Sequence, residues 1–297
     1  MRVAIYQPDV SGIKVGRVWT SMLLTCARQD VDLLVTAEFA VGGLPHTGVA
    51  AAERAIVAND LTNYTADASP DLTIVIGFTE NAKTDLHSSA AVLRSGRVIT
   101  VARKIHAREP GITAGDGSPV FTVAGIPCGI VICADATRTA PASRLAASGA
   151  KLLLCPLNND MSTSNATRWR EPTDNALAER ARETECWVVS ADVAGRSPGR
   201  HALAASRIYQ PDGQLVCPGS SEPGALLVHD ITPVNWGSTP LGGEHRGSPG
   251  RSPQTRRGLG EGAVHDVQPH PAQGRMRKGT WHRPDDAEAQ PLVERDR

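Results

Sequence analysis

Three reactive side chains stand at or near the ends of apolar segments that are far apart in the sequence. Glu38 follows the run LLVTA, Lys104 follows ITVAR, and Cys133 follows GIVI. A glutamate can take a proton from a thiol, and a lysine can stabilise the oxyanion formed when a thiolate attacks a carbonyl or nitrile carbon. The three could therefore carry out hydrolysis through a covalent intermediate. An ion pair beside an inert cysteine would use the same residue types.

The segment around Cys133 is the most informative of the three. Gly129 to Ile132 is a short apolar run with β-branched residues, which predicts a buried strand that ends on Cys133. The polar residues that follow could begin a helix, and the amide groups at a helix N-terminus favour a thiolate. The alternative is a space-filling cysteine, because this residue type is often buried and inert.

Apolar runs and helical spacing alternate along the chain and predict an α/β fold. The continuous apolar strands favour two sheets packed together with helices outside. The expected helices are 15–29, 51–66, 138–148 and 174–185, and the expected strands are 2–7, 32–39, 72–78, 87–94, 97–104, 120–124, 129–133, 151–156, 187–191, 204–210, 214–217 and 225–229.

Composition limits the function classes. The formal net charge is zero, which gives no reason to expect a nucleic acid or an anionic membrane as a partner. No apolar run approaches the roughly 20 residues of a membrane span, and the start MRVAIYQPD does not resemble a signal peptide, so we expect a cytoplasmic protein. The six cysteines include no C-x-x-C pair and the histidines have no ligand spacing, so we expect reduced thiols and no metal.

The composition changes abruptly near Pro233. Residues 235–297 contain no Ile, Phe or Tyr and are rich in Gly, Pro and Arg. Such a segment cannot bury enough apolar surface to offset its chain entropy. We therefore expect one domain over 1–233 and a disordered tail over 234–297, which could be native, a fused extension or a frameshift product.

The strings around the three reactive residues, taken in order, resemble a known family. TAEF, VARKIHAREPG and GIVICADATR are similar to the three catalytic signatures of the nitrilase or carbon–nitrogen hydrolase superfamily. AIYQPD, IVIGFTE, GAKLLLCP and ERARETECWVVSA are further similarities. The resemblance covers about residues 1–231 and implies a four-layer α-β-β-α sandwich with two mixed sheets, commonly a homodimer.

The resemblance also implies roles for individual residues. Glu38 would be the general base, Lys104 the oxyanion stabiliser and Cys133 the nucleophile that forms a thioester. The backbone amide of Ala134 would be a second oxyanion donor, and Glu109 best matches a glutamate that positions the substrate amide and the lysine. A solvent-exposed glutamate in a loop is the other interpretation of Glu109. No cofactor is implied, and the partners would be a small amide-type substrate and water.

Departures from the family pattern bear on the substrate. The sequence Cys133-Ala134-Asp135 resembles the amidase and carbamoylase branches, whereas nitrile-cleaving members more often show Cys-Trp-Glu. His87-Ser88-Ser89 replaces an Asn-Ser pair common at the fourth strand. We expect hydrolysis of a small amide or an N-carbamoyl compound. The alternatives are a nitrilase and a catalytically idle member that acts by binding.

Overall fold

The computed structural model describes residues 1–232. They form an α/β fold with two mixed six-stranded sheets and one small three-stranded sheet. The disordered tail expected over 234–297 lies outside the described residues.

The first sheet has a parallel centre and antiparallel edges. Strands β1, β2 and β3 are parallel, and β4, β5 and β15 are added antiparallel to their neighbours. The order across this sheet is β15 (Ala225–Asp230), β1 (Arg2–Gln7), β2 (Leu33–Val35), β3 (Thr73–Ala82), β4 (Asp85–Arg94) and β5 (Arg97–Arg103).

The second sheet has the same plan. Its central strands β10, β8 and β7 are parallel, and β13, β14 and β6 are antiparallel to their neighbours. The order is β14 (Leu215–Cys217), β13 (Arg207–Tyr209), β10 (Trp187–Ala191), β8 (Leu152–Pro156), β7 (Ile126–Ile130) and β6 (Phe121–Val123). The small sheet contains β11 (Arg196–Ser197), β12 (Arg200–Ala202) and β9 (Asp160–Ser162).

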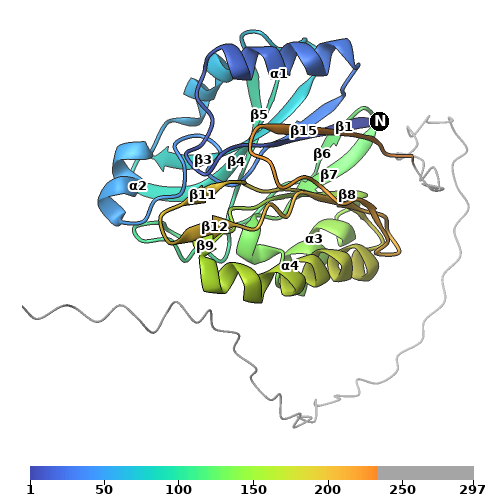
Figure 1. The fold of residues 1–297 in the computed structure, drawn as a ribbon. Coiled ribbons are helices and arrows are strands. Elements are labelled where there is room, and N and C mark those ends of the chain that lie inside the picture. Colours follow the sequence, from blue (N-terminus) through green and yellow to red (C-terminus); the bar gives the residue numbers. More distant parts are fainter. Residues whose placement is uncertain (233–297) are drawn as a thin grey trace, which may run out of the picture. The chain divides into compact units, whose positions relative to one another are not determined.

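Helices cover the outer face of each sheet, which completes four layers. Helix α1 (Arg17–Arg28) covers the first sheet, while α3 (Thr139–Ala147) and α4 (Thr163–Thr184) cover the second (Figure 1). One apolar cluster joins α1 to the outward side chains of the first sheet, and another fills the space between the sheets and beneath α3 and α4. The sequence-based prediction of an α-β-β-α sandwich is confirmed. The remaining helical segments are α2 (Gly48–Arg54) and the 3₁₀ segments η1 (Ala58–Thr65) and η2 (Cys133–Asp135).

Several expected elements differ from the observed ones, among them the strand expected over 32–39, which ends at Val35. The helix expected over 51–66 is split into α2 and the 3₁₀ segment η1. Helix α4 begins at Thr163 rather than at Asp174, because Ser162 caps it and tertiary contacts outweigh the cost of Pro172 inside it. Strand β7 ends at Ile130, so the chain leaves the sheet before it reaches Cys133.

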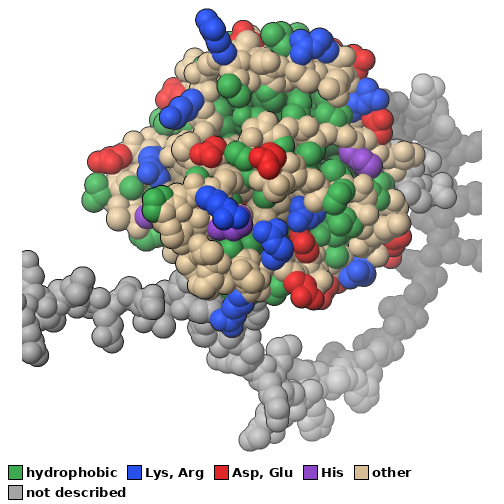
Figure 2. Space-filling model, in the orientation of Figure 1, with side chains coloured by type: hydrophobic (Ala, Val, Ile, Leu, Met, Phe, Trp, Pro, Cys, Tyr) green, Lys and Arg blue, Asp and Glu red, His purple; other side chains and the backbone are tan. Residues whose placement is uncertain are grey.

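The surface mixes charged and apolar side chains. On the face drawn in Figure 2, groups of Lys, Arg, Asp and Glu are interspersed with hydrophobic side chains. Among the described residues, no helix is long and apolar enough to cross a membrane.

Gly77 on β3 lies directly against the segment that carries Glu38. A Cβ atom at this position would be 2.2 Å from the backbone oxygen of Ala37 and 2.8 Å from the Cα atom of Glu38. Both contacts are with backbone, which cannot move aside without displacing the turn. Glycine is therefore required at this point of close approach.

We expect Gly77→Ala to lower the free energy of unfolding by about 3 kcal/mol, because it overpacks the sheet against backbone atoms. Urea unfolding followed by circular dichroism measures this. Gly48→Ala is the matched control, because its nearest contact is an ordinary 3.7 Å and its helical position suits alanine. Equal stability of the two variants would contradict the expectation.

Candidate active site

Glu38 lies in a buried turn just after β2, between the two sheets. Its backbone N–H donates to the carbonyl oxygen of Leu157, which follows β8 in the second sheet, at 3.0 Å. The side-chain amide of Asn158 donates to the backbone oxygen of Glu38 at 3.0 Å. Phe39 then takes a left-handed backbone with φ of 52°. The carboxylate is thus held by both sheets.

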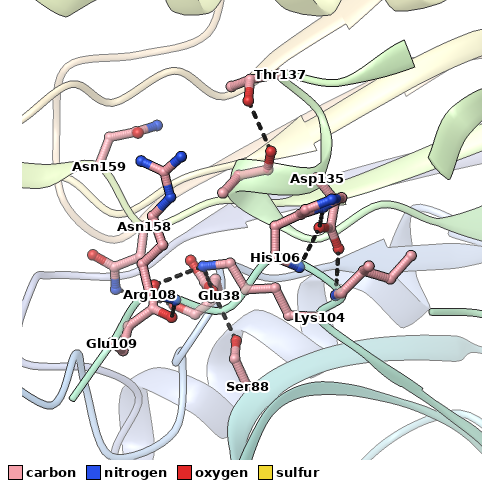
Figure 3. A network of polar contacts seen from close by, with 12 residues as sticks. Glu38, Ser88, Lys104, His106, Arg108, Glu109, Asp135, Thr137, Asn158 and Asn159 are labelled. Carbon is pink, nitrogen blue, oxygen red and sulfur yellow. Dashed lines mark hydrogen bonds and ion pairs between the residues drawn. The ribbon is translucent and has the colours of Figure 1, made fainter. Parts of the chain in front are cut away.

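The ammonium of Lys104 lies between two carboxylates (Figure 3). Its Nζ atom donates to Glu38 Oε1 at 2.7 Å and to Glu109 Oε1 at 2.6 Å. Ser88 on β4 donates its hydroxyl to the same Glu38 oxygen at 2.7 Å. Glu38 Oε2 is buried and has no hydrogen-bond partner among the described residues. Glu38 therefore keeps one oxygen able to accept a proton.

The charges of this cluster depend on one another. Burial raises the pKa of Glu38 above its usual range, although the charge of Lys104 opposes this. Burial by itself would lower the pKa of Lys104, but the charges of Glu38, Cys133 and Glu109 outweigh burial and raise it. Burial also opposes ionisation of Glu109, yet its contact with Lys104 holds the pKa of this carboxyl below its ordinary value. Lys104 consequently stays protonated.

Cys133 lies in the 3₁₀ segment η2 that follows β7. Its backbone is left-handed, with φ of 44°, which costs a residue with a side chain about 1 kcal/mol. The turn is closed by hydrogen bonds from the amides of Asp135 and Ala136 to the carbonyl oxygens of Ile132 and Cys133. The helix expected over 138–148 is observed as α3, which begins at Thr139, so the amides nearest to Cys133 belong to the 3₁₀ segment η2 rather than to the N-terminus of an α-helix.

Asp135 connects the Cys133 turn to the segment after Lys104. Its carboxylate accepts hydrogen bonds from the backbone N–H groups of Ile105 and His106 at 2.9 and 2.8 Å. It also contacts His106 Nδ1 at 2.6 Å. The next residue after Cys133, Ala134, has its carbonyl bonded by the Thr137 hydroxyl at 2.8 Å. The loops after β5 and β7 are thereby joined across the two sheets.

Asp192 fixes the loop that contains Asn158 through hydrogen bonds. This fully buried carboxylate accepts hydrogen bonds from the backbone N–H of Asn159 at 2.9 Å and from its side-chain amide at 3.1 Å. It also accepts from the amides of Val193 and Ala205, each at 2.9 Å. Asn158 therefore holds the Glu38 turn, and Asp192 fixes the neighbouring Asn159.

The structure brings Glu38, Lys104 and Glu109 into direct contact, and a negative charge on Cys133 raises the pKa of Lys104. Neither a role for Ser88 nor the bridge that Asp135 forms between the two loops is apparent from the sequence motifs. Ser88 could have been found, because it shares the inward face of β4 with Ala90 and Val92 and is polar where they are apolar. No comparable pattern signals the Asp135 bridge.

Within residues 1–232, no group of three or more His, Cys, Asp or Glu side chains is arranged to hold a metal ion. None of the six cysteines, all of which lie in this range, forms a disulfide.

Sequence comparison identifies relatives of two kinds. A glutamine-dependent NAD(+) synthetase of Xanthomonas campestris pv. campestris is 26% identical over an alignment of 233 residues that covers 70% of this chain and 40% of the synthetase. This chain thus spans less than half of that relative. The "hydrolase in pqqF 5'region" of Pseudomonas protegens is 27% identical over 228 residues, which are 73% of this chain and 78% of that protein.

Solved structures share the fold. An amidase from Nesterenkonia sp. superposes with a TM-score of 0.66 at 20% identity and covers 78% of this chain and 90% of its own. A glutamine-dependent NAD(+) synthetase from Acinetobacter baumannii matches with a TM-score of 0.64 at 19% identity and covers 76% of this chain and 44% of its own. The carbon–nitrogen hydrolase family model matches residues 2–241, and the chain therefore belongs to this family.

Proposed function

We propose that this protein is an amidase-type hydrolase that cleaves a small amide or an N-carbamoyl compound through a cysteine thioester. The observation that carries the proposal is the buried carboxylate of Glu38, which has one oxygen fixed by Lys104 and Ser88 and the other unbonded among the described residues. That arrangement suits a base rather than a purely structural ion pair, which would satisfy both oxygens.

In the first half-reaction, Glu38 takes the proton of the Cys133 thiol as the sulfur attacks the amide carbon. A carbon–sulfur bond forms, and the carbonyl oxygen becomes an oxyanion. Lys104 and the backbone amide of Ala134 stabilise that oxyanion. Glu38 then gives its proton to the leaving nitrogen, the carbon–nitrogen bond breaks, and ammonia or an amine departs to leave a thioester.

In the second half-reaction, Glu38 takes a proton from water, whose oxygen attacks the thioester carbon. The second oxyanion collapses, the carbon–sulfur bond breaks, and Glu38 returns the proton to the sulfur. Lys104 remains an ammonium throughout, because two carboxylates raise its pKa. Glu109 keeps Lys104 in position and accepts from the substrate amide.

The comparisons support the amide class. The structural relative from Nesterenkonia is named an amidase, and acrylamide is attached to its active-site cysteine in one of its structures. Other relatives are named glutamine-dependent, which makes the side-chain amide of glutamine a compound to test. A nitrile substrate and a protein that only binds are the competing outcomes.

Ammonia release should be measured for small amides, N-carbamoyl amino acids, glutamine and nitriles. We expect release from at least one amide or carbamoyl compound. Cys133→Ala should abolish it, and Glu38→Gln and Lys104→Ala should each lower kcat by about 10²-fold or more, since base and oxyanion donor contribute in that range.

Each outcome of this panel has a separate meaning. Release only from nitriles would identify a nitrilase. A folded wild-type protein that releases nothing, or a Cys133→Ala variant that keeps full activity, would contradict the proposed function. Circular dichroism and the unfolding transition of each variant establish that it is folded.

Ser88→Ala should move the acid limb of kcat/KM to higher pH. The Ser88 hydrogen bond stabilises the ionised form of Glu38, so its loss raises the pKa of a base that must be deprotonated to act. Below that pKa, activity falls as pH falls, and the variant should begin to lose activity at a higher pH than the wild type.

Ser89→Ala is the matched control for this shift. Ser89 is the next residue on β4, is equally buried, and donates to Glu80 instead of Glu38. Its acid limb should coincide with that of the wild type. Identical profiles for Ser88→Ala and wild type would show that Glu38 is not the titrating base.

A further inference from the structure

Asp135 joins the loop that carries the nucleophile to the loop that carries the lysine. Ile105 and His106 directly follow Lys104, and both donate backbone N–H groups to this carboxylate. Figure 3 shows the contacts of Asp135 with this segment. Asp135 itself belongs to the η2 segment that begins at Cys133.

Burial of the Asp135 carboxylate costs free energy, which indicates that this residue has a positioning role. Its side chain is 3% exposed, and burial of a carboxylate is unfavourable unless hydrogen bonds replace its hydration. Its recorded partners within residues 1–232 are two backbone amides and the His106 ring, all on the segment after β5. A residue that only filled space would not need to face three N–H positions of another loop.

The backbone of Lys104 is also fixed by strand β4 and by the loop that follows β5. Its N–H donates to the Ser88 carbonyl oxygen at 2.8 Å, and its carbonyl accepts from Gly115 at 2.7 Å. These bonds hold Lys104 to the first sheet but do not relate it to Cys133, which follows a strand of the second. Asp135 supplies that relation.

We infer that Asp135 is a positioning residue that sets the location of the Lys104 ammonium relative to the Cys133 thiol. The inference rests on the proposed function, in which these two groups act on the same carbonyl. The carboxylate of Asp135 bonds to the backbone N–H groups of Ile105 and His106 and acts through this backbone on Lys104, which precedes them.

The test measures alkylation of Cys133 by iodoacetamide, with the labelled peptide quantified by mass spectrometry. The measurement needs no substrate. An ammonium beside the sulfur favours the reactive thiolate, so Lys104→Ala should slow Cys133 labelling about tenfold. Cys217, which is partly exposed, serves as an internal control because its labelling should not change in any variant.

Asp135→Asn should also slow Cys133 labelling about tenfold. Loss of the Asp135 charge would by itself favour a nearby thiolate and speed labelling, so a slower rate reports displaced geometry. In the double variant Lys104→Ala/Asp135→Asn, the rate should equal that of the slower single variant, because Asp135 acts through Lys104.

Two results would overturn the inference while leaving the proposed function intact. One is an Asp135→Asn variant that labels at least as fast as the wild type, and the other is a double variant whose two effects multiply. An unchanged Cys133 labelling rate in Lys104→Ala would instead contradict the proposed Glu38–Lys104–Cys133 triad, and the inference about Asp135 would fail with it.

Loss of stability is controlled separately. Ile74→Ala removes a buried side chain from the cluster beneath α1, away from the site, and should label Cys133 at the wild-type rate although it unfolds more easily. Asp135→Ser breaks the bridge without setting an amide NH₂ against the Ile105 N–H. It is judged by the same criteria and decides the question if Asp135→Asn does not fold.

Discussion

The site depends on one buried ammonium shared by two carboxylates. Lys104 is 1% exposed and contacts Glu38 and Glu109 at 2.7 and 2.6 Å. A buried charge is tolerated only when partners replace its hydration, and here two anions face one cation. When both carboxylates are ionised, the cluster carries a net negative charge before the thiol takes part in the proposed reaction. In the proposed mechanism, transfer of the Cys133 proton to Glu38 moves one negative charge from the carboxylate to the sulfur and adds none.

Both sheets contribute residues to this cluster and hold them in place. Glu38 and Lys104 follow strands of the first sheet, and Cys133 follows a strand of the second. An apolar core fixes how far apart the sheets lie but leaves their relative sliding to weaker constraints. The contact of Glu38 with Leu157 and that of Asp135 with Ile105 are directional hydrogen bonds across this gap. These hydrogen bonds fix the position of one sheet relative to the other at the site.

Sequence patterns predicted the strands better than the turns. Runs such as Leu152–Pro156 are apolar throughout, because both faces of a central strand are covered, and their composition alone identifies them. The first half of α4 was missed, since its polar residues and Pro172 resemble a loop and only packing makes it helical. Ordered motifs indicated Glu38, Lys104, Cys133 and Glu109. The spacing of residues within a motif does not reveal the distance or orientation between two different sheets. The Asp135 bridge, which joins loops of both sheets, could therefore not be predicted.

The turns that carry Glu38 and Cys133 each contain a residue with a strained, left-handed backbone, and neighbouring hydrogen bonds must hold these turns in place. Phe39 and Cys133 have φ of 52° and 44°, a conformation that costs about 1 kcal/mol or more for any residue with a Cβ atom. Relaxation of either turn would change the direction of the adjoining Glu38 or Cys133 side chain. The Asn158 amide bonded to the Glu38 carbonyl and the Arg180 guanidinium bonded to the Ala136 carbonyl each brace one turn. Strain and bracing together restrict how the two turns can rearrange, and in the proposed mechanism this restriction is the preorganisation that stabilising an oxyanion requires.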